Sequence, residues 1–234
     1  MKNLKDLKIT IFGDSIGKGV ATDNGKIEVL KDNAVELFEK TYSVKVDNRS
    51  VFGQSLKRIM QRGVIDKYIQ NLNPNENSVA VLEIGGNDSD FNWREVSNSP
   101  QTSHQPNTPI DEFSFLYSSA IDKLKNAGVK VVVCTIVPID SKRFFDNFIS
   151  KQADKDKILQ FFKGDYNTIH RHQEMFNNEI IKNAYQKGCK IIDLRKKFLD
   201  TNVFDDLMCL DGIHPNGDGH AEIYSAISDF LVTA

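Results

Sequence analysis

The chain has 234 residues, and its 40% of hydrophobic residues, taken with 14 glycines, reaches roughly the apolar share of an ordinary globular protein, which excludes disorder as its main state. This length can bury a sizeable core and no linker or repeat divides it, so we expect a single domain over residues 1–234. Thirty Lys and Arg residues against 32 Asp and Glu give a net charge of -2, without a basic block. A nucleic-acid partner is therefore not expected.

The N-terminal residues and the length of the apolar runs indicate in which compartment the protein is expected. Lysines interrupt the N-terminal apolar residues before a signal-peptide core could form, and runs such as residues 131–134 stop far short of a membrane helix. Cys134, Cys189 and Cys209 are widely spaced and form no CxxC motif, so we expect reduced thiols. The sequence favours a soluble, cytoplasmic protein with no membrane partner.

The alternation of short β-branched runs with helical stretches predicts an α/β fold. Strands are expected over residues 7–12, 44–51, 79–84, 129–137 and 190–194. Apolar residues at three- and four-residue spacing predict helices over 28–42, 55–72, 112–127, 165–187 and 218–232, the last with Asp218 as its N-cap. This order predicts a three-layer α/β/α arrangement in which helices cover both faces of a five-stranded, parallel, doubly wound sheet.

The residues that follow the expected strands are the most informative, because ligands of open α/β sheets bind beyond the carboxyl ends of the strands. Four such segments carry reactive or small groups. They are Gly13-Asp14-Ser15, Phe52-Gly53, Gly85-Gly86-Asn87-Asp88 and Asp211-Gly212-Ile213-His214-Pro215. A hydroxyl, a glycine amide, a carboxamide and an Asp–His pair are thus expected at one edge of the sheet.

These groups have complementary chemistry. A serine hydroxyl is a poor nucleophile at neutral pH, and an imidazole is the best-matched base to take its proton. We therefore expect Ser15 to be the nucleophile and His214 its base. Asp211 precedes His214 by three residues on the same loop, close enough to accept the Nδ1 proton and to turn Nε2 toward Ser15. The three residues predict a Ser-His-Asp triad.

Attack on a carbonyl group places negative charge on its oxygen, and preorganised donors aimed at that oxygen are commonly the largest catalytic contribution. The candidate donors are the backbone amide of Ser15, the backbone amide of Gly53 and the side-chain NH2 of Asn87. Glycine suits this position because the absent Cβ lets the backbone approach a ligand closely. The sequence therefore predicts an oxyanion hole beside the triad.

The four segments resemble the motifs of the SGNH hydrolases, also called GDSL-type esterases and lipases. Gly13–Ser15 matches the GDS block, Gly53 the glycine of the second block, residues 85–88 the GxND block, and Asp211 with His214 the DxxH pair, all in the family's order. The resemblance implies a flavodoxin-like fold, hydrolysis of small acyl esters such as short-chain or acetyl esters, no metal or other cofactor, and the triad and oxyanion roles given above.

Two other functions are alternatives. A metal-dependent phosphoesterase could use as ligands Asp14, Asn87, Asp88, Asp211 and His214, although such sites usually need more histidines at the strand ends. A catalytically silent module that binds a glycan or an acyl group would carry the same motifs without turnover. Hydrolysis of an acetyl ester in the presence of a chelator separates these alternatives from a serine esterase.

Two connections, residues 85–111 and 138–164, are too long for simple turns and are expected to be functional. In them Trp93, His104 and Phe145 are candidates for substrate contact. The second connection also carries an apolar stripe formed by Phe144, Phe145, Phe148 and Ile149. We expect this stripe to roof an acyl pocket or to form a subunit contact, and a separate cluster packed against helix 165–187 is the alternative.

Three further histidines, His170, His172 and His220, are expected to be solvated or surface residues on helices rather than ligands. Nothing in the sequence distinguishes an acetylated sugar from a short-chain lipid as the substrate, and the oligomeric state stays open.

Overall fold

The computed structural model describes residues 4–23 and 26–233, and its centre is a parallel sheet of five strands in the order β4-β1-β5-β6-β7. The strands are β1 (Leu7–Gly13), β4 (Val46–Asn48), β5 (Asn77–Glu83), β6 (Lys130–Cys134) and β7 (Lys190–Ile192). Each expected run forms a strand, although those at β4, β6 and β7 are shorter than predicted. The doubly wound α/β fold is confirmed.

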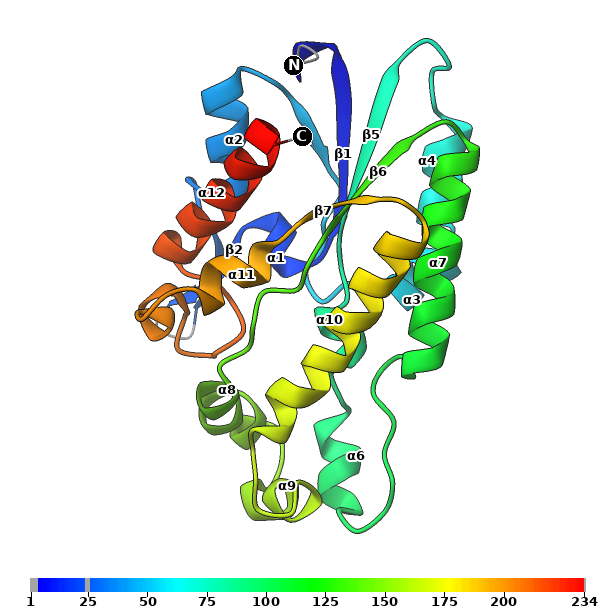
Figure 1. The fold of residues 1–234 in the computed structure, drawn as a ribbon. Coiled ribbons are helices and arrows are strands. Elements are labelled where there is room, and N and C mark those ends of the chain that lie inside the picture. The colour runs from blue at the N-terminus through cyan, green and yellow to red at the C-terminus, as the bar shows by residue number, and fades with distance from the viewer. Residues whose placement is uncertain (1–3, 24–25, 234) are drawn as a thin grey trace.

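Helices cover both faces of this sheet. They are α1 (Ser15–Lys18), α2 (Ala34–Tyr42), α3 (Leu56–Gln61), α4 (Val64–Gln70), α5 (Gly86–Ser89), α6 (Trp93–Asn98), α7 (Ile110–Asn126), α8 (Ser141–Asn147), α9 (Lys155–Phe161), α10 (Thr168–Gln186), α11 (Leu194–Leu199) and α12 (Gly217–Thr233), with 3-10 turns η1 (Leu4–Asp6), η2 (Ile149–Lys151) and η3 (Phe204–Leu207). In Figure 1, α2 and α12 lie on one side of the sheet, and α4, α7 and α10 lie on the other. Among the described residues, none of these helices has the length and apolarity needed to cross a membrane.

Three helix predictions differ from the structure at their starts or interiors. The predicted helix over 28–42 begins only at Ala34, because Lys26–Val29 forms a strand, β3, that pairs antiparallel with β2 (Val20–Asp23). The predicted helix over 55–72 is two helices separated at Gly63, which has a φ of 61°. At α12 the N-cap is Asn216 rather than Asp218, since Asn216 Oδ1 accepts the Gly219 amide at 3.0 Å.

The two faces of the sheet are covered to different extents. On the face that carries Phe12, Ala80, Leu82 and Val133, side chains of α3, α4, α7 and α10 complete a large core in which those four residues are no more than 1% exposed. On the other face, α2, α11 and α12 form a smaller cluster, and alternate residues of β1, β5 and β6 stay partly exposed. This second face therefore has room that the first lacks.

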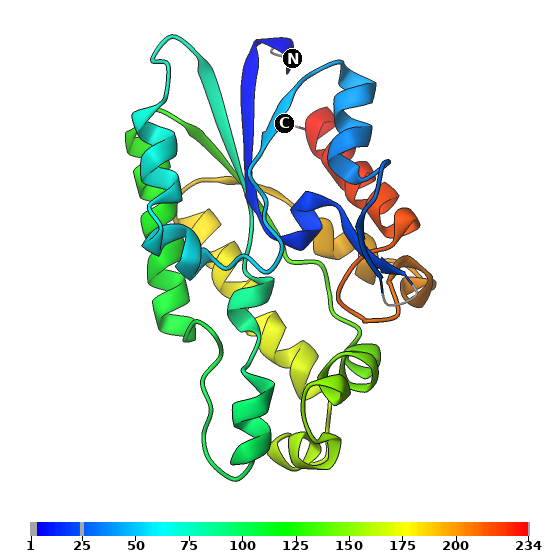
Figure 2. The same ribbon diagram turned by 180° about the vertical axis from the view of Figure 1, so that it is seen from behind.

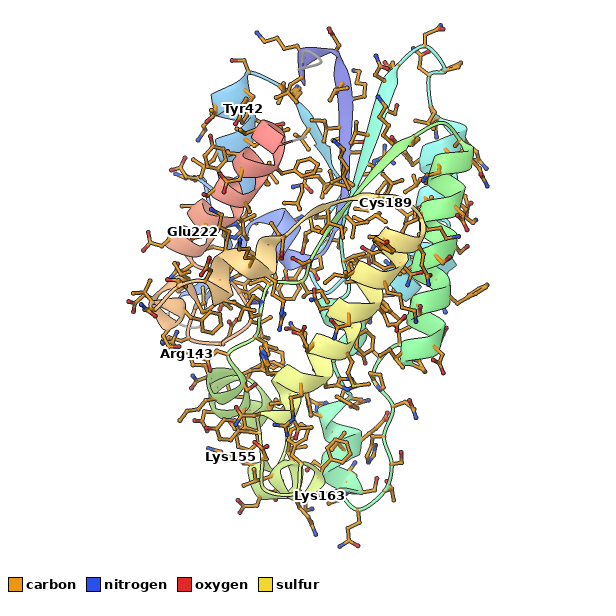
Figure 3. The ribbon with its side chains drawn as sticks, viewed as in Figure 1. Tyr42, Arg143, Lys155, Lys163, Cys189 and Glu222 are labelled. Atoms are coloured by element: carbon orange, nitrogen blue, oxygen red, sulfur yellow. The ribbon has the colours of Figure 1, made fainter. Side chains whose placement is uncertain are left out.

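A third cluster forms a lobe beyond the carboxyl ends of the strands, built from α6, α8, α9 and the start of α10 (Figure 2). Lys155 and Lys163 mark the end of this lobe that is farthest from the sheet (Figure 3). Within the lobe, Phe144, Phe145 and Ile149 are at most 3% exposed and pack with Trp93 and Ile169. The stripe therefore forms the separate cluster that was given as the alternative, packed against Ile169 of the predicted helix 165–187, with Phe148 partly buried against it.

The three histidines that were expected on the surface are also buried or half-buried. His172 lies between the rings of Phe91 and Phe176, at centroid distances of 4.8 and 5.3 Å. His220 is 1% exposed, and burial lowers its pKa to about 4. His170 is half-buried beside Arg195. The residues next to these histidines in the sequence are mostly polar, so the sequence does not show that the helices carrying them contact other elements on two sides.

Candidate active site

The turn from β1 into α1 presents Ser15 at the carboxyl edge of the sheet. Asp14 is the N-cap of α1, since its Oδ1 accepts the amide of Ile16 at 2.9 Å, and Ser15 is the first residue of the helix. Glycine is required on both sides of this turn. A Cβ atom at Gly13 or Gly17 would lie 2.6 to 2.8 Å from the side-chain oxygens of Ser50 and Glu83.

A chain of hydrogen bonds joins the three predicted triad residues. His214 Nε2 lies 2.9 Å from Ser15 Oγ, and His214 Nδ1 lies 2.6 Å from Asp211 Oδ2. Ser15 is 6% exposed and His214 is 5% exposed, so little bulk water competes for these bonds. The structure therefore brings together residues that are separated by almost 200 positions in the sequence.

The short 211–214 loop has its own local reason to fold this way. Asp211 Oδ1 accepts the backbone amides of Ile213 and His214 at 3.0 and 3.1 Å, so the carboxylate closes a tight turn while its second oxygen faces the imidazole. Gly212 has a φ of 73°, and a Cβ atom there would lie 2.6 Å from the carbonyl oxygen of Asp140 and the amide of Phe144. Helix α8 is thus seated directly against this loop.

The lobe braces the same loop through polar contacts. The amide of Asp140 donates to the carbonyl of Gly212 at 2.9 Å, and Asn147 Nδ2 donates to the carbonyl of Leu210 at 2.7 Å. Arg143, labelled in Figure 3, extends from α8 and donates to the carbonyl of Asp205 at 2.6 Å. Residues 138–164 therefore lie near the site as expected, but they act on the backbone of the loop and not as a roof.

Thr22 is a partner of the triad that the sequence does not reveal. Its Oγ1 donates to Asp211 Oδ2 at 2.5 Å, from strand β2 of the hairpin. Burial acts to raise the pKa of Asp211, but the hydrogen bond and charge of His214 and the hydroxyl of Thr22 outweigh it and hold this pKa at about 2. Asp211 is therefore a stable anion opposite the imidazole.

The candidate oxyanion donors surround the same edge. Asn87, in α5 after β5, donates from Nδ2 to Asp14 Oδ2 at 3.2 Å, which fixes the carboxamide beside Ser15. Burial raises the pKa of Asp14 to about 6, so this carboxyl is largely ionised at neutral pH and accepts the bond. Gly53 has a φ of 68°, and the position of a Cβ atom there is open space.

Asp88 has a structural role. Its carboxylate accepts the amides of Leu56 and Lys57 at 2.7 and 3.3 Å and the hydroxyl of Thr108 at 2.6 Å. It is fully buried and ties the end of β5 to the start of α3, which sets the position of the neighbouring Asn87. The oxygens that a metal-dependent phosphoesterase would need are thus occupied by protein donors.

Glu83, the last residue of β5, is a second buried carboxyl that the sequence does not single out. Its Oε2 accepts the amide of Gly17 at 2.8 Å, directly below α1. Burial raises the pKa of Glu83 well above its ordinary value, and the charge of Asp14 raises it further. The Glu83 carboxyl therefore supports the nucleophile turn through its bond to the Gly17 amide.

Comparison with known proteins agrees with this geometry. A model of the GDSL-like lipase and acylhydrolase family matches residues 11–222, which is most of the chain. The chain belongs to the GDSL-like lipase/acylhydrolase family. Members of this family are SGNH hydrolases, and the chain is accordingly a carboxylic ester hydrolase. No curated protein sequence matches the chain.

Solved structures of this family share the fold at low sequence identity. A lipase/acylhydrolase from Enterococcus faecalis is 17% identical, with 96% of this chain and 94% of that chain covered and a TM-score of 0.64. The acetyl xylan esterase AlAXEase is 22% identical over 95% and 98%, with a TM-score of 0.61. An acetyl xylan esterase from Geobacillus stearothermophilus is 16% identical over 96% and 94%, with a TM-score of 0.64.

Three side chains that were expected to contact substrate are not brought to the triad. Trp93 is 4% exposed, and Phe145 is 3% exposed and stacks on Tyr166. His104 lies in the same lobe, where its Nε2 is 2.9 Å from the carbonyl of Ser99 and its ring meets Phe161. These contacts are packing and turn contacts within the lobe, and a role of the three residues in substrate binding stays a prediction.

Phe52 is a better candidate for contact with substrate in this family member. Its ring stacks on the imidazole of His214 at a centroid distance of 6.0 Å and an interplanar angle of 13°, and it is 49% exposed. An aromatic face that is open to solvent beside the base can contact an apolar part of an ester. Sequence reasoning used this residue only as the neighbour of Gly53.

No group of three or more His, Cys, Asp or Glu side chains within residues 4–23 and 26–233 is arranged to hold a metal ion. The one histidine at the strand ends, His214, has both ring nitrogens in the chain from Ser15 to Asp211. The arrangement is suited to proton transfer from a hydroxyl.

Proposed function

We propose that this family member is a serine esterase for small acyl esters, in which Ser15 is the nucleophile, His214 the general base and Asp211 the group that orients and charges the imidazole. The observation that carries the proposal is the continuous chain from Ser15 Oγ through the imidazole to Asp211 Oδ2, with distances of 2.9 and 2.6 Å. Distances of this size are those of working hydrogen bonds between a nucleophile, its base and an orienting carboxylate.

In the first half-reaction, Ser15 Oγ attacks the carbonyl carbon while its proton passes to His214 Nε2. The Nδ1 proton stays on the imidazole and donates to Asp211, whose anion stabilises the imidazolium that forms. His214 then gives the proton to the alcohol oxygen as the C–O bond breaks, which leaves an acyl group on Ser15. Water attacks that acyl group with the same assistance from His214 and releases the acid.

The negative charge of the tetrahedral intermediate needs donors at the same edge. The Asn87 NH2 group has two protons, and because one is directed to Asp14 the second can point at the oxyanion. The amides of Ser15 and Gly53 complete the proposed hole, and the left-handed backbone at Gly53 leaves open space where a side chain would otherwise block the approach. Each donor is worth about 10²–10³ in rate.

We propose short acyl groups, such as acetyl, as the substrate class. Two of the similar structures are acetyl xylan esterases by title, which supports this choice at the level of fold. The aromatic rings of the lobe pack mainly on one another. The exposed ring of Phe52 is available to the alcohol side of a small ester.

The test is hydrolysis of p-nitrophenyl acetate, with and without EDTA, by the wild type and by Ser15→Ala. We expect turnover that EDTA does not reduce and that Ser15→Ala abolishes. Loss of activity in EDTA would indicate a metal-dependent hydrolase, and no turnover of any p-nitrophenyl ester from acetate to dodecanoate would indicate a binding module. A preference for dodecanoate over acetate would contradict the proposed substrate class.

A further inference from the structure

The two peptide groups that flank Gly53 differ in their hydrogen bonds. In the group after Gly53, the amide of Gln54 donates to the carbonyl of Val51 at 3.1 Å. The carbonyl of Gly53 in the same group accepts a hydrogen bond from Arg58 Nη1 at 2.8 Å. In the group before Gly53, the Gly53 amide has no acceptor among residues 4–23 and 26–233. One peptide group is thus bonded at both ends, and the other presents a free donor.

Side-chain packing does not hold this turn. Val51 is 47% and Phe52 is 49% exposed, and the position of a Cβ atom at Gly53 has no heavy atom within 4 Å. Glycine has more backbone freedom than any other residue, so its own sterics do not restrain the φ of 68° at Gly53. The direction of its amide is therefore set by hydrogen bonds, among them those from the Val51 amide to the carbonyl of Gly13 and from Arg58 to Gly53.

The helix that carries Arg58, α3, is also anchored beside the second side of the proposed oxyanion hole. The amides of Leu56 and Lys57 in its first turn donate to the carboxylate of Asp88. Asp88 directly follows Asn87 in α5. Through Arg58 at one end and Asp88 at the other, α3 sets the spacing of the two proposed donors.

The guanidinium of Arg58 is not used in an ion pair. Among the described residues the structure gives Arg58 no carboxylate partner, whereas the neighbouring Lys57 pairs with Glu112 at 2.9 Å. A hydrogen bond from a charged donor is stronger than one between neutral groups. The carbonyl of Gly53 is therefore the group that orders this exposed side chain.

We propose that Arg58 is a positioning residue of the oxyanion hole, whose guanidinium holds the Gly53 turn so that the free Gly53 amide points at the oxygen of the tetrahedral intermediate. Donors of this kind are effective because their orientation is set before the reaction begins. Arg58 acts through the backbone of Gly53 and not by contact with the substrate. The inference rests on the proposed esterase function, because an oxyanion forms only if Ser15 attacks a carbonyl carbon.

Arg58→Met tests this role, because it keeps the apolar stem of the side chain and removes its donors. With p-nitrophenyl acetate, kcat should fall about tenfold and KM should stay within about twofold of wild type, since the donor acts mainly in the transition state. Arg58→Lys retains a charged donor and should stay within about threefold of wild type. Arg62→Ala, at an exposed arginine that caps the end of the same helix, is the control and should match wild type.

The combination of Arg58→Met with Asn87→Ala shows which donor depends on Arg58. Gly53 and Asn87 are separate donors, so the loss caused by Arg58→Met should be the same in the wild type and in Asn87→Ala. A loss that disappears in Asn87→Ala would mean that Arg58 acts on Asn87 through α3, and would contradict a role at Gly53.

A second measurement does not depend on turnover. The heteronuclear 15N NOE of the Gly53 amide should be lower in Arg58→Met than in wild type or Arg62→Ala, because the following peptide group loses one of its two bonds and moves more on the picosecond to nanosecond timescale. An unchanged NOE would contradict the proposal. An unchanged urea midpoint of Arg58→Met shows that the rate loss does not come from unfolding.

Failure of this proposal differs from failure of the esterase proposal. If the wild type hydrolyses p-nitrophenyl acetate and Ser15→Ala does not, while Arg58→Met keeps the wild-type kcat, the role of Arg58 alone is wrong. If the wild type has no turnover, or Ser15→Ala retains it, the esterase proposal is wrong and the role of Arg58 in an oxyanion hole is wrong with it. A lower kcat in Arg58→Met at unchanged KM, with near wild-type activity in Arg58→Lys, is the expected result.

Discussion

Two regions at the same edge of the sheet, the loops of the triad and the lobe of α6, α8 and α9, use their residues in opposite ways. In the triad loops, each polar side chain has a directed partner: Ser15 with His214, His214 with Asp211, and Asp211 with Thr22. In the lobe, aromatic rings contact one another and are closed to solvent. The first region has the hydrogen bonds that the proposed proton transfer needs, and contacts from α8 of the second region hold the backbone of the 211–214 loop.

The comparison teaches that position beyond a strand end is not enough to mark a substrate-binding residue. Trp93 and Phe145 lie in connections that follow β5 and β6, yet both serve the packing of the lobe. The lobe affects chemistry indirectly, because α8 seats the backbone of the 211–214 loop.

Phe145→Ala should have the largest effect of these variants, and that effect should be on stability and not on the preference for ester chain length. Removing a buried phenylalanine ring should lower the free energy of unfolding by about 3–5 kcal/mol, while the chain-length preference of the folded enzyme stays unchanged. Urea unfolding and a panel of p-nitrophenyl esters measure the two quantities. Phe115→Ala, at a 71% exposed ring on α7, is the control and should cost little stability. A changed ester preference in Phe145→Ala would restore a role for the lobe in the pocket.

Asn87→Ala should instead lower activity and leave stability nearly unchanged. The loss of one oxyanion donor should reduce kcat by about 10²–10³, with only a small change in the urea midpoint. Steady-state hydrolysis of p-nitrophenyl acetate measures the effect, and Asn75→Ala, in an exposed turn, is the matched control. A decrease below threefold would exclude Asn87 from the oxyanion hole.

Thr22→Val tests the contact between the hairpin and the triad at a smaller scale. It removes the hydroxyl but keeps the shape of the side chain, so we expect kcat to fall about tenfold, equivalent to roughly 1.4 kcal/mol, the size of a hydrogen bond to a charged group. Thr22→Ser, which retains the hydroxyl, should be close to wild type. Equal activity of the two variants would show that Asp211 does not depend on Thr22.

Thr22→Val should also change how the free energy of unfolding depends on pH. The pKa of Asp211 is depressed from 3.8 to about 2 in the folded protein, so its ionised form stabilises the fold above pH 4 and this contribution is lost as the pH falls toward 2. Without the hydroxyl the pKa should rise. The difference in free energy of unfolding between wild type and Thr22→Val should therefore have its largest value above pH 4 and decrease as the pH falls below 4. Urea unfolding at several pH values measures it.

Glu83→Gln should have the smallest effect on stability, and its dependence on pH should be opposite to that of the Asp211 contribution. The pKa of Glu83 is raised in the fold, so the protonated carboxyl contributes stability that is present below its ordinary value of 4.5 and lost as the pH rises through the folded value. The carboxamide does not titrate, so the stability of Glu83→Gln relative to wild type should increase with pH. Glu222→Gln, on the outer side of α12 (Figure 3), should show no such trend in urea midpoints between pH 5 and 9.

The sequence predicts the parts of the molecule that local pattern controls. The β-branched runs specify the five strands, and the strand-end rule brings Ser15, Asn87, Asp211 and His214 to one edge before any coordinates are considered. The helix over 55–72 is predicted as one element because its apolar spacing continues across Gly63, whereas the left-handed backbone there divides it.

What the sequence does not reveal depends on contacts between distant segments. The hydroxyl of Thr22 is 189 positions from Asp211, and nothing about a threonine in a hairpin indicates a carboxylate as its partner. Glu83 reads as the polar end of a strand, yet tertiary packing buries it under α1. The aromatic stripe was correctly expected to be buried, and Ile169 lies in the helix that the alternative named, but nothing in the sequence indicates that Trp93 and Val96 of α6 complete the cluster.

The most direct test of the central claim, that Ser15 and His214 act as one unit, is a comparison of Ser15→Ala, His214→Ala and the double variant in hydrolysis of p-nitrophenyl acetate. Because the hydroxyl without its base and the base without its hydroxyl are both ineffective, each single variant should lose at least about 10⁴ in kcat, and the double variant should be no slower than the slower single variant. A double variant whose loss is the product of the two single losses, or a Ser15→Ala enzyme with wild-type turnover, would contradict the triad.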